Sequence, residues 1–307
     1  MAASLPKAAL TTLGVVGATA ITAAVWGVGV ERYLYTVRRH ALEVLPEGAE
    51  PIKVLHLSDL HMAPWQRRKQ DWIASLADLR PDVVVNTGDN LGHRDGLDGL
   101  RVAFDPFADI PGVFVHGSND VQGPSFRNPL LYFTGPSRHR PEVQLLDTAA
   151  LDEFMSAGLG WTDLDDTATA LDVNGVRVNA FGVDDPHRGW DDLDRAADAA
   201  AALAPGDLTL GVAHAPYRRI LDAFTDMGAD LLLAGHTHGG QVRIPLSSKA
   251  LVANCDIPLD QARGLSAWSH GGRTIPLNVS AGVGHSIFAP VRFACRPEVT
   301  LLTLLPR

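Results

Sequence analysis

The sequence predicts an α/β fold preceded by an apolar N-terminal segment. Short runs of Val and Leu, bounded by Gly and Asp, recur along the chain and are typical of buried strands. Segments with apolar residues at helical spacing alternate with these runs, which predicts helices packed against an open sheet. A chain of 307 residues with 46% hydrophobic content is long enough to bury one large core.

Residues 8–30 contain no charged side chain and form a stretch long enough to cross a bilayer. The alternatives are a buried helix and a cleaved signal peptide, although the apolar part of a signal peptide is usually about 7–15 residues long. We expect an uncleaved single-pass anchor. Lys7 precedes the segment, and Arg32, Arg38 and Arg39 follow it. This small excess favours a cytoplasmic catalytic domain, but the side of the membrane stays open.

A linker and lead-in strand are expected over residues 31–51, because Pro and Gly lie near the end of this segment. The catalytic domain is then expected to cover residues 52–307. Its first helix is predicted over 66–79, where Trp72, Ile73, Leu76 and Leu79 share one face. That helix begins with Arg67-Arg68-Lys69. These side chains either form a solvated helix face or attract an anionic substrate or lipid headgroup.

The alternation continues with a strand over 82–86, a helix over 97–108 and a strand over 112–116. Residues 123–141 interrupt it with a Pro-rich stretch, and so long a loop beside a site is often a substrate lid. The basic side chains of this loop are Arg127, Arg138, His139 and Arg140. They are candidates for phosphate or headgroup contacts, or else ordinary solvated charges.

The second half repeats the pattern. Residues 172–178 predict a hairpin that turns at Asn174-Gly175. A strand is expected over 180–186, ending in an acidic pair, and an exposed amphipathic helix over 191–204. Further strands are predicted over 208–213, 231–234, 241–244, 275–279 and 298–304. No internal repeat or Gly-rich nucleotide-binding motif is present.

Metal-preferring side chains stand at or just past the ends of five predicted strands. They are Asp59 and His61, Asp89, Asn119, His214, and His236 with His238. Because function collects where the carboxyl ends of sheet strands meet, these side chains are expected to converge. A lone Asp after a strand is usually a cap or turn residue, so the combination carries the prediction. An Asp/Asn/His set suits Mn, Fe, Zn or Co.

A two-metal hydrolytic centre needs particular ligand chemistry. Two cations about 3.5–4 Å apart require a bridging anion, several neutral donors, and open positions for water and substrate. Asp89 stands alone at the end of its strand and is the natural bridging carboxylate.

The order and spacing of these residues resemble the calcineurin-like metallophosphoesterases, from Ile52 to the C-terminus. The family pattern runs Asp-x-His, Gly-Asp, Gly-Asn-His-Asp/Glu, His and Gly-His-x-His. The corresponding segments are Asp59-Leu60-His61, Gly88-Asp89, Gly117-Ser118-Asn119-Asp120, His214 and Gly235-His236-Thr237-His238. The membrane-associated bacterial branch is the most similar, because the chain continues with Gly239-Gly240-Gln241 and later has Pro290-Val291-Arg292 and Arg296-Pro297-Glu298.

The resemblance implies a four-layer α/β/β/α sandwich and a metal-dependent phosphoester hydrolase with two divalent ions. The implied ligands are Asp59, His61, Asp89 and His238 for one metal, and Asp89, Asn119, His214 and His236 for the other. A metal-activated hydroxide would attack phosphorus in line. Members of this branch include hydrolases of lipid-linked pyrophosphates, and a membrane anchor would suit such an amphiphilic phosphodiester or pyrophosphate.

The third motif departs from the family pattern. An ungapped match puts Ser118 on the metal-binding Asn and Asn119 on the His that contacts substrate. Since Ser is a poor ligand, we expect a one-residue slip that makes Asn119 the donor and leaves the usual His without an equivalent. Asp120 and His116 are the candidate catalytic proton donors, and His116 is equally compatible with a side chain that points away from the site.

Charge and cysteine content narrow the function classes. A formal charge of −9 argues against nucleic acid as a partner, because phosphate backbones require a basic surface. Cys255 and Cys295 could form one disulfide or none. The missing motif histidine keeps an alternative open: a catalytically weakened metal-binding or scaffolding protein at the membrane.

Overall fold

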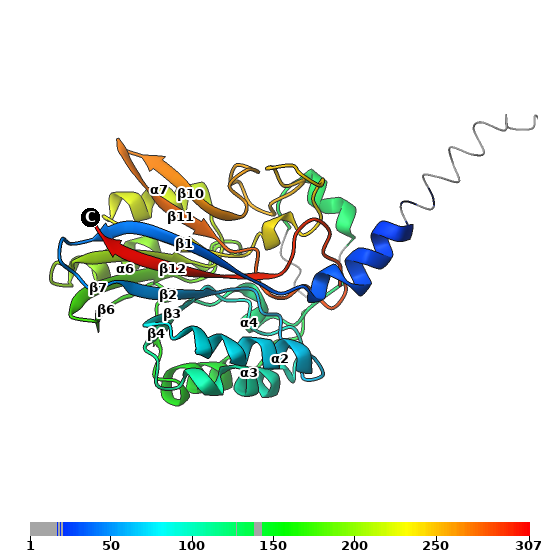
Figure 1. Ribbon diagram of the computed structural model, residues 1–307, viewed down its shortest axis with the longest axis horizontal. Coiled ribbons are helices and arrows are strands. Elements are labelled where there is room, and N and C mark those ends of the chain that lie inside the picture. The colour runs from blue at the N-terminus through cyan, green and yellow to red at the C-terminus, as the bar shows by residue number, and fades with distance from the viewer. Residues whose placement is uncertain (1–16, 18, 20, 127, 138–142) are drawn as a thin grey trace, which may run out of the picture.

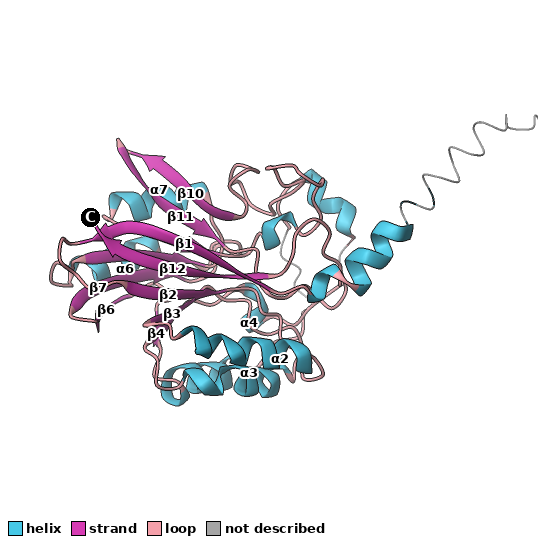
Figure 2. Ribbon diagram, viewed as in Figure 1, coloured by secondary structure: helices cyan, strands magenta, loops and turns pink. Residues whose placement is uncertain are grey.

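Two six-stranded sheets packed face to face form the centre of the protein, with helices on their outer faces (Figures 1 and 2). The computed structural model describes residues 17, 19, 21–126, 128–137 and 143–307. The chain is a mixed α/β sandwich, and its layers follow the order helix, sheet, sheet, helix that the family resemblance implied.

The first sheet combines both ends of the folded chain. In spatial order its strands are β1 (Thr36–Leu45), β12 (Glu298–Pro306), β2 (Ile52–Leu57), β3 (Val83–Asn86), β4 (Gly112–Phe114) and β5 (Thr162–Asp163). Strands β2 to β5 are parallel, and β12 runs antiparallel to β2. The segment 31–51 therefore contains a 3-10 turn, η1 (Glu31–Tyr33), and a ten-residue edge strand that pairs with the last strand of the chain.

The second sheet comes from the second half of the sequence. Its order is β10 (Gly264–His270), β11 (Arg273–Val279), β9 (Leu231–Ala234), β8 (Leu208–Ala213), β7 (Val176–Val183) and β6 (Ala168–Val173). The predicted hairpin at Asn174-Gly175 is confirmed, because both residues take positive φ and join β6 to β7. The central strands are parallel, so their carboxyl ends meet at one edge.

Three apolar clusters hold the layers together. Aliphatic side chains of both sheets, among them Val54, Val85 and Leu210, fill the space between them. The outer face of the first sheet is covered by α2 (Arg67–Ala74), α3 (Gly96–Phe104) and α5 (Thr148–Asp152). The outer face of the second is covered by α6 (Leu193–Ala201) and α7 (Arg218–Asp226). The near-continuous Val and Leu runs are thus strands buried on both faces.

The shorter elements modify the sequence prediction. The helix predicted over 66–79 is α2 followed by the 3-10 turn η2 (Ser75–Leu79), and α3 is followed by η3 (Asp105–Phe107). The remaining short elements are α4 (Ser118–Val121), η4 (Pro129–Thr134), the π-helical η5 (Glu153–Gly158) and η6 (His238–Gly240). The strand predicted over 241–244 is wrong. Gly240 and Gln241 take positive φ and bend the chain, leaving one bridge from Val242 to Phe293.

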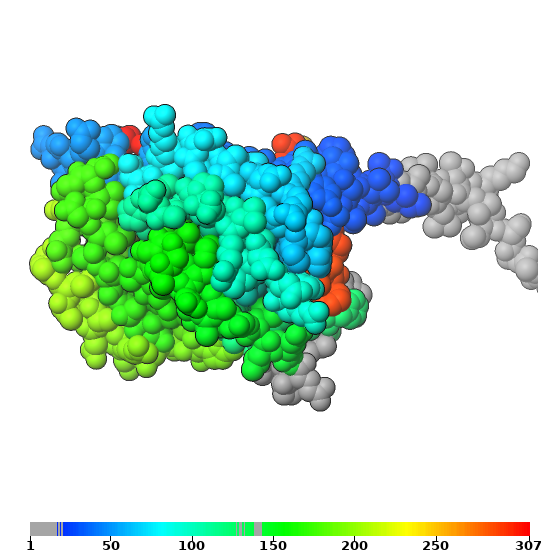
Figure 3. All heavy atoms as spheres, turned by 90° about the horizontal axis from the view of Figure 1, so that it is seen from below, coloured from blue at the N-terminus to red at the C-terminus, as the bar shows by residue number. Residues whose placement is uncertain are grey.

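An apolar helix protrudes from the body at the N-terminus. Residues 21–29 are helical, and nearly all their side chains are exposed (Figure 3). Most of the predicted anchor, residues 8–30, lies outside the described residues. Within the described part of the chain, no helix combines the length and the apolar character needed to cross a membrane. The predicted contacts Arg127, Arg138, His139 and Arg140 also lie outside the described residues.

The fold brings together, at one end of the molecule, the strand ends that carry the predicted metal ligands. The carboxyl ends of β2, β3 and β4 in the first sheet and of β8 and β9 in the second meet there. The N-terminal helix leaves the body at the same end (Figure 1). Both cysteines in the described chain are free.

Candidate metal centre

The candidate ligands follow their strands in a strained backbone conformation. Left-handed φ values occur at Asp59 (49°), His61 (41°), Asp89 (54°), His236 (66°) and His238 (48°). Each such residue costs on the order of 1–3 kcal/mol, and strain of this kind persists only where the surrounding structure imposes it. Five strained residues at one point indicate that the conformation of these loops serves to orient the candidate ligands.

Four side chains form the first group of donors. Single donor atoms of Asp59, His61, Asp89 and His238 all lie within 4.8 Å of one another. The Nε2 atoms of His61 and His238 are 3.1 Å apart, and the Nε2 of His238 is 3.4 Å from Oδ1 of Asp59. Two nitrogens bound to one tetrahedral metal at about 2.0–2.1 Å stand about 3.3 Å apart. The buried Oδ1 of Asp59 has no hydrogen-bond partner, so the group fits a cation.

A second group of donors lies on the other side of Asp89. The Nε2 of His214 is 3.6 Å from Oδ1 of Asp89 and 3.2 Å from Nδ1 of His236. The other oxygen of Asp89, Oδ2, is 3.6 Å from Nε2 of His61 in the first group. One carboxylate therefore faces both groups, which is the geometry that a bridging ligand requires.

Neighbouring groups orient these ligands. The Nδ1 of His214 donates to the Thr87 carbonyl at 2.7 Å, and its Nε2 faces Asp89. Burial alone would lower the pKa of His214, but Asp89, Asp185 and Asp59 outweigh it and raise the pKa to about 9. The Asp59 Oδ2 accepts hydrogen bonds from the Ser58 hydroxyl at 2.5 Å and the His236 backbone amide at 2.9 Å. These contacts tie the loop after β2 to the loop after β9, far apart in sequence.

Two buried basic side chains, Lys69 and Arg292, hydrogen-bond to the loops that carry the candidate ligands. Lys69 is 3% exposed, and its Nζ donates to the carbonyls of Leu60 and His61. Lys69 therefore belongs neither to a solvated helix face nor to a headgroup-binding one. Arg292 is fully buried and donates to the backbone carbonyls of His238, Ala281 and Gly284, among others. Both side chains neutralise carbonyl dipoles that the left-handed loops turn inward.

Burial and mutual charge set the protonation states. Burial lowers the pKa of His61 to about 4 and the pKa of His236 and His238 well below 6.5. These rings are therefore neutral, the form in which histidine binds metal. Burial raises the pKa of Asp59 to about 6. Burial alone would also raise the pKa of Asp89, but His214 and His61 outweigh it and lower the pKa to about 2. Asp89 is thus an anion in need of positive partners.

The motif glycines are required by close approach. A Cβ at Gly117 would overlap the Asp89 carboxylate, and a Cβ at Gly235 would overlap the Ser58 hydroxyl. Only glycine lets these two loops pass so near the ligands.

In the third motif, Asn119 is the residue that contacts Asp89. Its side-chain amide donates to Oδ2 of Asp89 at 2.7 Å, and its backbone amide donates to Oδ1 at 2.8 Å. Ser118 is buried, and within the described chain its hydroxyl makes no hydrogen bond. Of these two side chains, Asn119 is the one that touches Asp89, and its role as a metal ligand stays a prediction.

Asp120 is held by backbone amides. Its carboxylate accepts hydrogen bonds from Asn90 at 2.7 Å, Leu91 at 3.2 Å and Gly117 at 3.1 Å. Burial raises its pKa to about 6. These contacts join the loop after β3 to the start of α4, so the carboxylate fixes the positions of Asp89 and Asn119.

His116 pairs with two carboxylates outside the ligand cluster. Its Nδ1 is 2.7 Å from Asp165, and its Nε2 is 2.8 Å from Asp152. Burial alone would lower the pKa of His116, but these two carboxylates outweigh it and hold the pKa well above 6.5. His116 is therefore a buried cation at neutral pH.

The structure adds residues beside the second group that the sequence analysis did not single out. The ring of His187 lies 4.3 Å from that of His236, and its nitrogens are 2.9 Å from the Tyr217 hydroxyl and 2.8 Å from the Ser137 hydroxyl. Asn254 contacts Nε2 of His236 at 3.2 Å. His187 follows the end of β7 and the acidic pair Asp184-Asp185, with Pro186 between, so its place past a strand end was an available signal.

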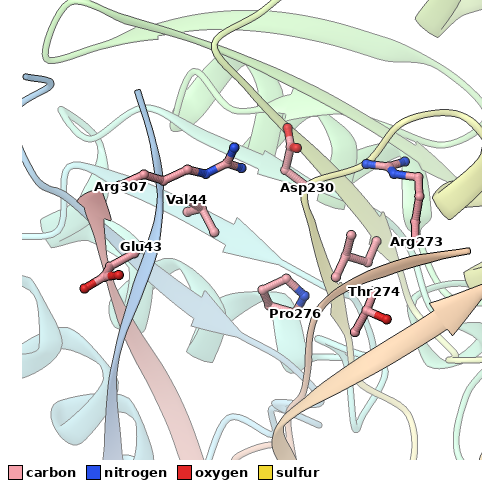
Figure 4. A pocket seen from close by; sticks show the side chains of 8 residues that line it. Glu43, Val44, Asp230, Arg273, Thr274, Pro276 and Arg307 are labelled. Atoms are coloured by element: carbon pink, nitrogen blue, oxygen red, sulfur yellow. The ribbon is translucent and has the colours of Figure 1, made fainter. Parts of the chain in front are cut away.

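A cavity at the opposite end of the sandwich contains none of these ligands. Its volume is about 480 Å³, and Glu43, Asp230, Arg273 and Arg307 are among the charged side chains around it (Figure 4). It lies at the carboxyl ends of β1 and β12 and at the starts of β9 and β11. The candidate metal centre lies instead at the opposite end of the sandwich, on the loops that follow β2, β3, β4, β8 and β9.

The model of the calcineurin-like phosphoesterase family matches residues 52–240. Phosphodiesterase YaeI of Escherichia coli is 29% identical over 280 residues, which cover 87% of each chain. An uncharacterized metallophosphoesterase of Bacillus subtilis, YkuE, is 24% identical and covers 95% of this chain and 94% of its own. A transmembrane protein with metallophosphoesterase domain of Bos taurus is 27% identical over 85% of this chain and 54% of its own.

Substitutions in the third motif should show whether Asn119 or Ser118 is the metal ligand. Asn119→Ala is expected to lower the metal content from about two ions per chain towards one, because the second group loses a donor. Ser118→Ala should leave the content unchanged, and Asp89→Asn should lower it most, since the bridge serves both groups. Metal analysis of the purified variants measures this. Equal losses from Ser118→Ala and Asn119→Ala would show that the match is not slipped.

The His116 ion pairs should make stability depend on pH. The folded pKa is raised, so the contribution is fully present below the ordinary pKa of 6.5 and is lost as the pH rises through the folded value. His116→Gln is expected to lower the free energy of unfolding by about 2 kcal/mol at pH 6, as for hydrogen bonds to charged groups, and by less at alkaline pH. Urea denaturation from pH 6 to pH 10 measures the difference.

A difference that stays constant or grows with pH would contradict this account of His116. The same variant also tests His116 as a proton donor. A donor would lower turnover of substrates with alkyl leaving groups and leave aryl phosphates nearly unchanged.

Proposed function

We propose that this chain, which belongs to the calcineurin-like phosphoesterase family, hydrolyses an amphiphilic phosphodiester or pyrophosphate close to a membrane. The chain is a metal-dependent phosphoesterase with a dinuclear centre of divalent cations. The observation that carries the proposal is the Asp89 carboxylate, which faces one group of donors with each oxygen. When bound, the two cations supply an activated water and stabilise charge on the phosphoryl oxygens.

The proposed ligand sets follow the two groups around Asp89. They are Asp59, His61, Asp89 and His238 for one cation, and Asp89, Asn119, His214 and His236 for the other. The separations of 3.1 Å and 3.2 Å between paired imidazole nitrogens support them. The amide of Asn119 would present its oxygen to a cation, since its nitrogen and oxygen exchange places by rotation.

The proton donor to the leaving group is a separate proposal. His116 remains a candidate because its ion pairs keep it protonated at neutral pH. Asp120 is the second candidate, and its three backbone contacts support a positioning role at least as well.

The membrane part of the proposal is supported by the N-terminal helix. Ile21, Val25 and Trp26 are 67%, 64% and 43% exposed, although they are apolar. The carbonyl of Gly27, at the foot of this helix, accepts a hydrogen bond at 3.2 Å from the Arg292 amide. The Arg292 guanidinium in turn donates to the His238 carbonyl at 3.0 Å. Attachment of this helix to a bilayer would hold the metal centre at the membrane surface.

The comparisons support this proposal in two respects. The Escherichia coli relative is named a phosphodiesterase, which favours a diester over a monoester for this chain. The Bos taurus relative is named a transmembrane protein, which favours membrane attachment.

The alternative is a metal-binding protein with weakened catalysis. It is motivated by the third motif, where the usual histidine has no equivalent and both candidate donors, His116 and Asp120, are bound by other groups. Metal content and turnover separate this alternative from the enzyme.

The first prediction of this function is metal-dependent turnover. Purified protein with Mn²⁺ should hydrolyse bis-(p-nitrophenyl) phosphate, and a chelator should abolish the reaction. Asp89→Asn should lower kcat/KM by about 100-fold or more, because the cations supply several kcal/mol of transition-state stabilisation. A protein that retains about two ions per chain and turns over no phosphoester would instead support the weakened-catalysis alternative.

The second prediction concerns substrate class. Hydrolysis of phospholipids, lipid-linked nucleotide sugars and soluble nucleotides should be compared in mixed micelles, with phosphate-containing products measured directly. We expect the highest kcat/KM for an amphiphilic diester or pyrophosphate, because the protruding helix and the metal centre share one end of the molecule. A preference for soluble nucleotides would rule out the lipid proposal and leave the phosphoesterase activity intact.

A further inference from the structure

A second cavity lies at the foot of the N-terminal helix and is lined by arginines. Its volume is about 490 Å³, and its lining includes Trp26, Arg38, Pro245, Arg263, Phe293 and Arg296. These residues come from the N-terminal helix, β1, the loop after η6, the start of β10 and the chain before β12. The orange-red region near residue 290 meets the blue helix at this place (Figure 3).

The acidic residues near the cavity are already engaged. Glu298 is buried and pairs with Arg38 at 2.9 Å. Glu31 is also buried and accepts hydrogen bonds from the Trp26 indole at 2.8 Å and the Cys295 amide at 2.7 Å. Glu31 uses both of its oxygens, and the second oxygen of Glu298 is buried without a hydrogen-bond partner. Within the described chain, neither carboxylate pairs with Arg263 or Arg296.

Two guanidinium groups in the cavity lack an anionic partner. Arg296 is exposed, and within the described chain it makes no ion pair or hydrogen bond. Arg263 has only a weak contact, at 3.6 Å, to the Cys295 sulfur. Guanidinium groups bind phosphate with paired hydrogen bonds, so the cavity offers a receptor for a phosphate-bearing anion.

Exposed apolar residues adjoin the arginines. Ile244 and Leu246 flank the lining residue Pro245 and are 58% and 107% exposed. Leu246 also has a φ of 66°, an unfavourable conformation for a bulky residue, and yet its side chain points fully into solvent. On the helix, Val28 and Val30 are 40% and 38% exposed. These apolar residues form a rim around the arginines. A soluble anion would make no contact that requires such a rim, whereas at a bilayer its apolar side chains can enter the acyl region beneath the phosphates.

We propose that this cavity binds the headgroup of an anionic phospholipid. Arg296 and Arg263 bind the phosphate, and Ile244 and Leu246 enter the edge of the hydrocarbon. The inference rests on the membrane location proposed above and not on hydrolysis. Because the loop that carries both apolar residues directly follows the ligand motif ending at Gly240, the bound lipid also turns the metal centre towards the membrane surface.

The test uses full-length protein in neutral detergent micelles and three probes: dihexanoyl phosphatidylglycerol, dihexanoyl phosphatidylcholine and inorganic phosphate. Calorimetric titration should show selective binding of the phosphatidylglycerol. Arg296→Gln should weaken this binding about tenfold, the loss expected for one charge-assisted contact. The matched control is Arg39→Gln, an exposed arginine next to Arg38 on β1 that does not line the cavity; it should change binding less than about twofold. Both variants should retain turnover of a soluble aryl phosphate.

A second arm tests the apolar rim on vesicles. Anionic vesicles should raise turnover, and Ile244→Ser with Leu246→Ser should lower this gain. Val102→Ser, at an apolar residue of α3 that is 49% exposed, should leave the gain unchanged. Equal effects of Arg296→Gln and Arg39→Gln would overturn the proposal. Loss of inorganic phosphate binding in parallel with phosphatidylglycerol would show a free-anion site and overturn the lipid assignment. Lower aryl phosphate turnover in Arg296→Gln would place the cavity in the catalytic centre, against the proposal.

Discussion

Two buried carboxylates surrounded by imidazoles are the constraint on which the rest of this structure depends. Asp59 and Asp89 are 0% and 3% exposed, and an isolated carboxylate in such surroundings would be protonated rather than charged. Histidine rings converge on the same points from both sheets. Cations bound at these points would attract both carboxylates and would hold together the loops that carry the donor atoms.

The backbone around the cluster is shaped by that requirement. Five candidate ligands have left-handed φ values, and glycines stand where a Cβ would overlap a candidate ligand or its neighbour. Lys69 and Arg292 lie buried behind the ligands and bind the carbonyls that this conformation turns inward. The strain is held by contacts between loops that are far apart in sequence, such as Asp59 with the His236 amide.

One end of the molecule combines three features that have different origins. The metal centre belongs to strand ends of both sheets, the protruding helix belongs to the N-terminus, and the arginine-lined cavity belongs to segments between them. Arg292 connects the first two, with its amide on the Gly27 carbonyl and its guanidinium on the His238 carbonyl. This shared end is the reason for proposing a membrane-proximal substrate.

The sequence by itself determined the main strands and the residues that gather at their ends. This was possible because a Val- or Leu-rich run followed by Gly and Asp is a local pattern, and parallel strands bring their ends together whatever the details of packing. Only tertiary structure decided the pairing of β1 with β12, the burial of Lys69 and the contact of His187 with His236. Each of these depends on groups far apart in the chain, whose contact no local pattern encodes. Asn119 lies between the two cases: its residue type suggested a ligand, and the fold placed it on Asp89.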